Sequence, residues 1–193
     1  MSTPEMTGYH KTSDLPSVTQ ILSPYSNYDQ IPEHRLEAAA ARGVAVHAYC
    51  AAHAKGAWAP TPPMEYRGYV DSFRQWFDIF ECEVLLCEEE LEDVQLGYCG
   101  HPDLCVRSIR LGGIILPDLK TPLALHRKPW GCQLAAYDQL VKTTKQIRPD
   151  RVGSLQLSPD GRAAKFEDFT GNLQEYFRAF FSALVCHKFF SQG

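Results

Sequence analysis

The chain has 193 residues, of which 45% are hydrophobic and 22% charged, and its formal net charge is −4. This length suits one domain with a substantial core and is too short for two comfortable ones. No signal peptide opens the chain, no apolar run approaches the roughly 20 residues of a membrane span, and the seven scattered cysteines form no CxxC pair. We therefore expect a cytoplasmic protein with free thiols and no membrane partner.

Three helices are predicted before the first strand. Ser17 is expected to cap a short helix that ends before Pro24. An alanine-rich helix follows from about 32 to 55, and an amphipathic helix from 65 to 80. The stripe of the alanine-rich helix that is expected to face the core consists of Leu36, Ala40, Gly43, Val44, His47 and Ala51.

The rest of the chain alternates strands with two helices. The expected strands lie at 81–91, 96–107, 113–120, 151–157 and 162–168, and the helices at 130–144 and 173–190. Ser158-Pro-Asp-Gly161 is a strong turn signal between the last two strands. The order predicts an α/β protein in which helices flank a mixed central sheet of about five strands. Residues 1–16 are expected to form a flexible arm, and residues 17–193 a single domain.

Two acidic residues and a lysine come from neighbouring predicted strands. Gly100-His-Pro-Asp103 is followed fifteen residues later by Asp118-Leu-Lys120-Thr121. Side chains alternate along a strand, so Asp118 and Lys120 are expected to face the same way. Two converging carboxylates suit Mg²⁺ or Mn²⁺, and a lysine beside them can orient a water molecule. This equipment is suited to hydrolysing a phosphodiester.

Pro117 directly precedes the second acidic residue. Proline cannot donate a hydrogen bond to a strand ladder, so it belongs at an edge or a bulge. We expect it to bend the strand where Asp118 turns toward the metal.

Other polar groups accompany this pattern, and each has a plain structural alternative. Arg42-Gly-Val-Ala-Val-His47 puts a histidine on the inward stripe, where a buried core histidine is an equal interpretation. Glu88-Glu-Glu90 ends the first strand, and such runs are usually solvated. Gln133 and Tyr137 lie four residues apart on one helical face and could also be a buried amide and ring.

Local positive charge follows the strand that carries Asp118 and Lys120. Solvated faces of a helix and a loop explain these runs as well as a phosphate backbone does. The candidate DNA contacts are Arg127, Lys128, Lys142, Lys145 and Arg148.

Taken in order, these elements resemble the RecB-type branch of the PD-(D/E)XK nuclease superfamily. The pattern of that branch is RG-x-x-x-H, a glutamate, G-x-x-D, (D/E)-x-K-T and Q-x-x-x-Y, and it is matched from Arg42 to Tyr137. The final hairpin and aromatic helix are similar to those of phage-type and mitochondrial genome-maintenance exonucleases. The resemblance implies a restriction-endonuclease-like core and a Mg²⁺- or Mn²⁺-dependent DNA exonuclease. It would serve recombination or repair in a bacterial or phage-infected cell.

The resemblance also implies how a metal is held. Asp103 and Asp118 would bind it with the backbone carbonyl of Leu119. Glu88, which the spacing favours over the two glutamates after it, would bind directly or through water. His47 would be a ligand or a partner of a ligand. Asp103, Asp118 and Glu88 thus join Lys120 as the implied catalytic residues.

The remaining implied roles concern water and DNA. Lys120 would position and help deprotonate the attacking water, or stabilise charge on the scissile phosphate. Gln133 and Tyr137 would orient that lysine or the DNA backbone. Some relatives hold an iron–sulfur cluster on one upstream cysteine and three near the C-terminus; here only Cys186 lies there, so no cluster is expected. A second copy of the chain and a single-strand annealing protein are the partners considered.

Three alternatives remain open at this stage. An endonuclease would use the same chemistry with different surfaces around it. A non-cutting nucleic-acid-binding protein of the same fold typically loses the lysine or an acid, and here both are present. A zinc protein lacks cysteine and histidine pairs at ligand spacing.

Overall fold

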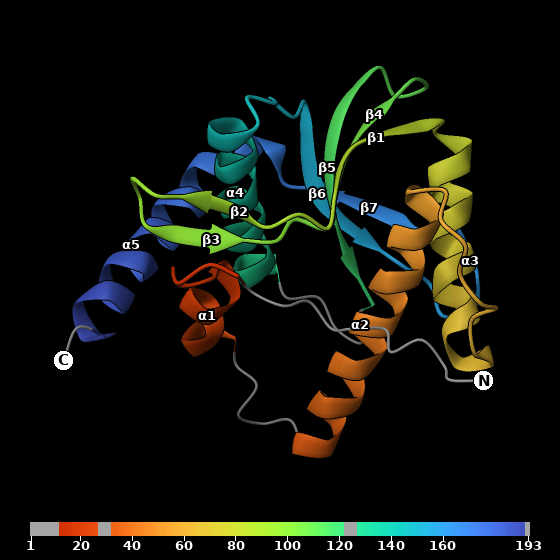
Figure 1. The fold of residues 1–193 in the computed structure, drawn as a ribbon, viewed down its shortest axis with the longest axis horizontal. Helices are drawn as coiled ribbons and strands as arrows, with labels where there is room; N and C mark the ends of the chain where they lie inside the picture. The colour runs from red at the N-terminus through yellow and green to blue at the C-terminus, as the bar shows by residue number, and fades with distance from the viewer. Residues whose placement is uncertain (1–11, 27–31, 122–126, 192–193) are drawn as a thin grey trace.

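The computed structural model describes residues 12–26, 32–121 and 127–191, which form an α/β fold around a five-stranded mixed sheet (Figure 1). The helices are α1 (Val18–Leu22), α2 (Glu33–Ala54), α3 (Met64–Ile79), α4 (Arg127–Thr144) and α5 (Leu173–Ser191), with short 3-10 turns η1 (Ser23–Tyr25) and η2 (Thr170–Asn172). The strands are β1 (Cys82–Cys87), β2 (Leu91–Asp93), β3 (Tyr98–Gly100), β4 (Leu104–Ser108), β5 (Gly113–Lys120), β6 (Arg151–Gln156) and β7 (Lys165–Asp168). The predicted α/β class with a mixed central sheet is confirmed.

The central sheet has the order β1-β4-β5-β6-β7, and β2 pairs with β3 in a separate ribbon. Among the described strands of the central sheet, β5 and β6 run parallel and the other neighbours run antiparallel. The predicted hairpin is confirmed as β6 and β7, joined across the turn that ends at Gly161.

Helices cover both faces of this sheet (Figure 1). Ile115 and Leu119 of β5 pack with α2 and α3, whereas Leu116 packs with α1, α4 and α5. Because side chains alternate along a strand, Asp118 and Lys120 share the face of Leu116. Both polar side chains therefore face the layer that contains α4.

The core-facing stripe expected for α2 is wrong in part. Val44 is 54% exposed, and the buried residues of this helix are Val46, Tyr49 and Cys50. Alanine side chains are small enough to tolerate either environment, so the alanine-rich pattern does not determine which face is buried. In α3, which was predicted to be amphipathic, large aromatic residues such as Phe73 and Trp76 mark the buried face.

The strand predicted at 96–107 is two strands in the structure. It breaks at His101, Pro102 and Asp103, so that β3 pairs with β2 while β4 pairs with β1 and β5. Pro102 cannot donate to a ladder, and this favours the break. Gly100 is needed just before it, because a Cβ there would lie 2.8 Å from both Tyr137 Cε1 and Leu140 Cδ1 of α4.

Pro117 lies in a central strand but at a local edge. The pairing of β4 with β5 ends at Ile115, whereas the pairing of β6 with β5 continues to Lys120. At Pro117 the strand therefore has a ladder partner on one side only, and the missing N–H of proline breaks no ladder bond.

The predicted N-terminal arm is described only in part. Residues 1–11 lie outside the described residues. Residues 12–16 lie along the β2-β3 ribbon, where the Pro16 carbonyl accepts the N–H of Cys99 at 3.0 Å and Glu90 accepts the N–H of Thr12 at 2.9 Å. Within the described ranges, no helix combines the length and apolar character needed to cross a membrane.

Candidate metal and catalytic site

The candidate site lies where β5 loses β4 as its neighbour. The N–H of Leu119, which no longer has a partner strand, donates to Asp103 Oδ2 at 2.6 Å. The carbonyl of Leu119 accepts from His47 Nε2 of α2 at 3.0 Å. His47 Nδ1 also lies 3.2 Å from Asp103 Oδ1. A carboxylate and an imidazole thus occupy the edge that a strand would otherwise cover.

His47 and Asp103 form a charged pair. Burial disfavours the protonated ring, but the facing carboxylate outweighs it and raises the pKa of His47 to about 9. Burial also acts to raise the pKa of Asp103, but the charge of His47 and the hydrogen bonds hold it below its usual range. The carbonyl of Leu119 can only accept, so His47 Nε2 carries a proton while Nδ1 faces the carboxylate.

Glu88 completes a cluster of three potential metal ligands. One ligand atom from each of His47, Glu88 and Asp103 lies within 4.8 Å of the other two. Opposite ligands of a six-coordinate Mg²⁺ are about 4.2 Å apart, so this spacing suits one ion after small movements. Two carboxylates form a hard-oxygen donor set, and the residues present therefore fit a divalent ion once the imidazole gives up a proton.

The backbone directs Glu88 toward this cluster. Its φ of 51° lies in the left-handed region, and its N–H donates to the Asp103 carbonyl at 3.0 Å. The next two glutamates point elsewhere: Glu89 pairs with Lys145 at 2.5 Å, and Glu90 accepts from Thr12. Among the three glutamates, Glu88 is the one that joins Asp103.

A second group of side chains links β5 to α4. Lys120 Nζ lies 2.5 Å from Asp118 Oδ2 and donates to Gln133 Oε1 at 2.9 Å. Gln133 Nε2 donates in turn to the Tyr137 hydroxyl at 3.1 Å. The ammonium also lies 5.6 Å from the centroid of the Trp130 ring, within range of a cation–π contact. We call Asp118, Lys120, Gln133 and Tyr137 the lysine row.

Asp118 belongs to the lysine row and lies outside the three-ligand cluster. It is 3% exposed, and burial, aided by the negative charge of Asp103, raises its pKa to about 6 although Lys120 opposes the shift. Its neighbour in the parallel ladder is Ser154, whose buried hydroxyl has no hydrogen-bond partner among the described residues. The resemblance implied five metal ligands. The structure brings four of them together, namely the side chains of His47, Glu88 and Asp103 and the carbonyl of Leu119. The fifth, Asp118, pairs with Lys120 instead.

Two contacts here were not anticipated from the sequence. His101 Nδ1 lies 3.0 Å from Glu88 Oε2 and so touches a ligand of the cluster. Arg42 Nη2 donates to the Thr121 carbonyl at 3.2 Å, which joins the first and fourth motif elements. The sequence signal that could have pointed to His101 is its position inside the Gly100–Asp103 motif.

The basic residues expected to contact DNA do not form one row. Lys142 lies 2.6 Å from Asp138, and Lys145 pairs with Glu89, as described above. Arg127 and Lys128 begin α4, roughly 22 Å along the helix axis from Lys142. Arg148 is exposed beyond the end of that helix.

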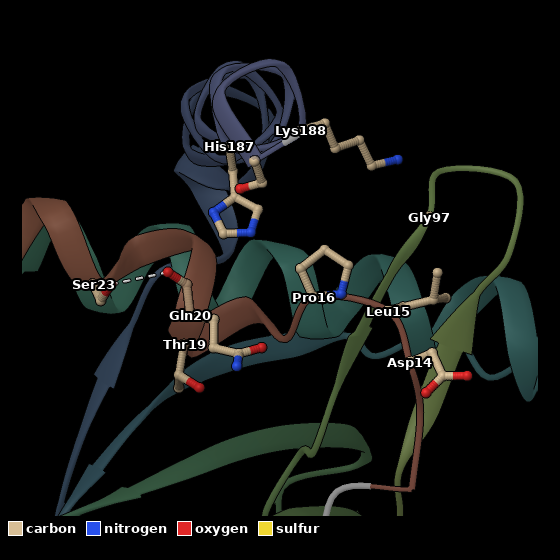
Figure 2. Close-up of a pocket in the computed structure, with 10 residues that line it drawn as sticks. Asp14, Leu15, Pro16, Thr19, Gln20, Ser23, Gly97, His187 and Lys188 are labelled. Carbon is tan, nitrogen blue, oxygen red and sulfur yellow. Dashed lines mark hydrogen bonds between the residues drawn. The ribbon is translucent and has the colours of Figure 1, made fainter. Parts of the chain in front are cut away.

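Two hollows lie beside α1 and α5 rather than at the three-ligand cluster. One, of about 870 Å³, is bounded by the start of α1, Gly97 and the end of α5, where His187 and Lys188 lie (Figure 2). The other, of about 450 Å³, is bounded by Tyr25, Lys128 and the middle of α5. Lys128 thus borders a hollow instead of the lysine row.

In comparisons with known proteins, no family model and no curated protein matches the chain. A functional interpretation therefore depends on the residues themselves.

Proposed function

We propose that the chain is a Mg²⁺- or Mn²⁺-dependent deoxyribonuclease of the PD-(D/E)XK type, with a restriction-endonuclease-like core, that degrades DNA from its ends. The lysine row carries the proposal: its members come from two elements and make an unbroken series of contacts beside Asp103. An acid-x-lysine pair that arose by chance would not be expected to have a glutamine and a tyrosine ordering its ammonium.

In this proposal Asp103, Glu88 and His47 hold the ion, with the Leu119 carbonyl beside them. A bound divalent ion lowers the pKa of its water and offsets negative charge on the phosphate. Asp103 has a second task, because its carboxylate also accepts the N–H of Leu119 and so ties the cluster to β5.

Lys120 is the residue that acts on the water or the phosphate. Its ammonium has three N–H donors, and Asp118 and Gln133 engage it from two sides. The third donor can orient a water for in-line attack or stabilise a non-bridging phosphate oxygen. Gln133, itself bonded to Tyr137, keeps the ammonium from turning away.

The proposed setting is phage-type recombination or repair in the cytoplasm of a bacterium or an infected host. DNA is the proposed substrate. A second copy of the chain would raise processivity, and a single-strand annealing protein would receive the strand left by the enzyme.

The deciding experiment is digestion of end-labelled linear DNA and closed circular DNA, single- and double-stranded, with Mg²⁺, Mn²⁺ or EDTA. We expect metal-dependent loss of linear DNA while circles persist. Cleavage of circles would instead identify an endonuclease with the same site. Binding of DNA without cleavage in any metal would identify a non-cutting protein.

Variants connect the activity to the lysine row. Asp118→Ala and Lys120→Ala are expected to abolish cleavage while circular dichroism shows a retained fold. Arg110→Ala is the matched control, since this exposed arginine pairs with Glu81 just before β5 begins, at the opposite end of that strand from Lys120. Wild-type activity in either variant of the lysine row would refute the assignment.

A further inference from the structure

Polar side chains continue from Lys120 across the sheet toward β7. In the ladder, Lys120 is paired with Gln156 of β6, and Ser154 of β6 is paired with Glu167 of β7. Paired residues share a face, so Gln156 and Glu167 lie on the same side of the sheet as Lys120. Gln156 Nε2 donates to Glu167 Oε2 at 2.9 Å.

The other oxygen of Glu167 holds the first residue of α4. Arg127 Nε donates to Glu167 Oε1 at 2.5 Å, and Arg127 Nη2 contacts the same oxygen. The Glu167 side chain is 10% exposed, whereas that of Arg127 is 64% exposed. A nearly buried carboxylate with both oxygens engaged thus holds a guanidinium whose outer edge faces solvent.

Helix stability does not explain an arginine at this position. The N-terminus of a helix carries partial positive charge, so a cation in the first turn is unfavourable there. Lys128 adds a second cation to the same turn. Glu167 offsets this repulsion and itself needs a cation, because its carboxylate is nearly buried. The exposed edge of the guanidinium is then available to a negatively charged ligand.

We propose that Glu167 and Gln156 are positioning residues that hold Arg127 to bind a backbone phosphate next to the scissile one. The inference rests on the proposed function for the identity of the substrate. Neighbouring strands are about 4.8 Å apart, so Gln156 lies one spacing from Lys120. Glu167 lies two spacings across the sheet and level with Asp118, two residues along the strand from Lys120. This offset is why the proposal assigns Arg127 to a flanking phosphate and not to the phosphate at Lys120.

The guanidinium keeps donors for this task. Arginine has five N–H donors, and Glu167 engages those on Nε and Nη2. In the described part of the chain Glu167 is its one acceptor, which leaves Nη1 for a phosphate oxygen. Arginine binds phosphate through the fixed planar geometry of its guanidinium group. Holding that group in place therefore strengthens binding.

The test compares Arg127→Ala, Glu167→Gln, Gln156→Met and the Arg127→Ala/Glu167→Gln double variant. Asp168→Asn is the matched control, because it follows Glu167 in β7 but lies on the other face of the sheet, where it pairs with Arg151 at 3.0 Å. Binding of a short fluorescent DNA is measured by anisotropy over a salt series with Ca²⁺ replacing Mg²⁺. Cleavage with Mg²⁺ gives kcat and KM separately, and thermal melting confirms that each variant folds.

We expect Arg127→Ala to weaken DNA binding and raise KM roughly tenfold, with kcat within about threefold of wild type. In this variant the salt dependence of DNA binding should fall by the equivalent of about one phosphate contact. Glu167→Gln and Gln156→Met should weaken binding by smaller factors. The double variant should bind no worse than Arg127→Ala alone, because the positioning residues act only through the arginine. Asp168→Asn should match wild type.

Each other outcome has a distinct meaning. If Arg127→Ala weakens binding while Glu167→Gln and Gln156→Met bind like wild type, the positioning role is refuted. If Arg127→Ala also binds like wild type while Lys120→Ala abolishes cleavage, this inference fails and the proposed function stands. If wild-type protein neither binds nor cuts DNA, the proposed function itself fails.

Discussion

The two edges of β5 are used in opposite ways. On the β6 side, ladder pairing runs from Ile115 to Lys120, and backbone bonds to backbone; the N–H of Leu157, for example, donates to the Lys120 carbonyl at 2.8 Å. On the β4 side, pairing ends at Ile115, and both backbone groups of Leu119 bond to side chains instead. One edge stabilises the sheet, and the other edge builds the candidate site.

The contrast has a simple physical origin. Buried backbone N–H and C=O groups need partners, so an edge that loses its neighbouring strand recruits side chains. Here those side chains are a carboxylate and an imidazole, which are also metal ligands. The departure of β4 at Asp103 therefore creates the cluster, and changes at the two edges should have unequal effects.

Among substitutions of the side chains that bond the two edges of β5, the largest effect is expected for Asp103→Ala, on the open edge. Losing a metal ligand should lower kcat/KM for cleavage about 10³-fold, which corresponds to a loss of several kcal/mol of transition-state stabilisation. The N–H of Leu119 also loses its acceptor, which should cost about 1–3 kcal/mol of folding free energy. Steady-state kinetics and urea unfolding measure the two losses. Ser154→Ala on the β6 side is the control and should change neither, because its hydroxyl has no hydrogen-bond partner among the described residues.

Next in size is Gly100→Ala, at the point where β3 ends. The new Cβ would meet Tyr137 and Leu140 at 2.8 Å, so we expect a loss of about 1–3 kcal/mol of stability from overpacking. A shift of Tyr137 would also disturb Gln133 and lower kcat. Gly43→Ala in α2, where a Cβ would meet no atom of the described residues within 4 Å, should raise stability by up to about 1 kcal/mol. Equal stability of the two variants would show that α4 does not press on Gly100.

His47→Ala sharpens the comparison by removing the second side chain on the open edge. We expect Mn²⁺ affinity to fall about 10–100-fold, measured by isothermal titration calorimetry. His53 lies on the same helix and pairs with Asp78 at 3.1 Å. His53→Ala is therefore the control and should leave the Mn²⁺ affinity unchanged. Wild-type Mn²⁺ affinity in His47→Ala would place the metal elsewhere.

The smallest effect is expected for Lys142→Ala. Its ammonium is engaged by Asp138, so its loss should change DNA binding by less than about twofold and barely alter the salt dependence. Arg148→Ala should weaken binding more, because Arg148 is exposed and makes no ion pair with a described residue. The salt dependence of DNA binding measures both. If Lys142→Ala weakened DNA binding by much more than twofold, the result would show that DNA displaces Asp138 from Lys142.

Much of the fold was predictable because local patterns determine it. The aromatic stripe of α3, the capping of α1 by Ser17 and the hairpin before Phe169 depend on residues close together in the chain. The shared face of Asp118 and Lys120 follows from strand alternation alone. By contrast, the buried face of alanine-rich α2 and the break after Gly100 depend on what packs against them.

The sequence by itself determined the α/β class, the order along the chain of the helices and of the central-sheet strands, and most of the residues from which the candidate site is built. Only the tertiary structure decided that Asp118 pairs with Lys120 instead of joining the three-ligand cluster, and that Glu167 holds Arg127. It also brought Glu88, which the spacing had only favoured, beside Asp103. Helix and strand preferences are local, so a single segment reveals them. Contacts between side chains far apart in sequence exist only after β4 has left β5 and α4 has packed on the sheet.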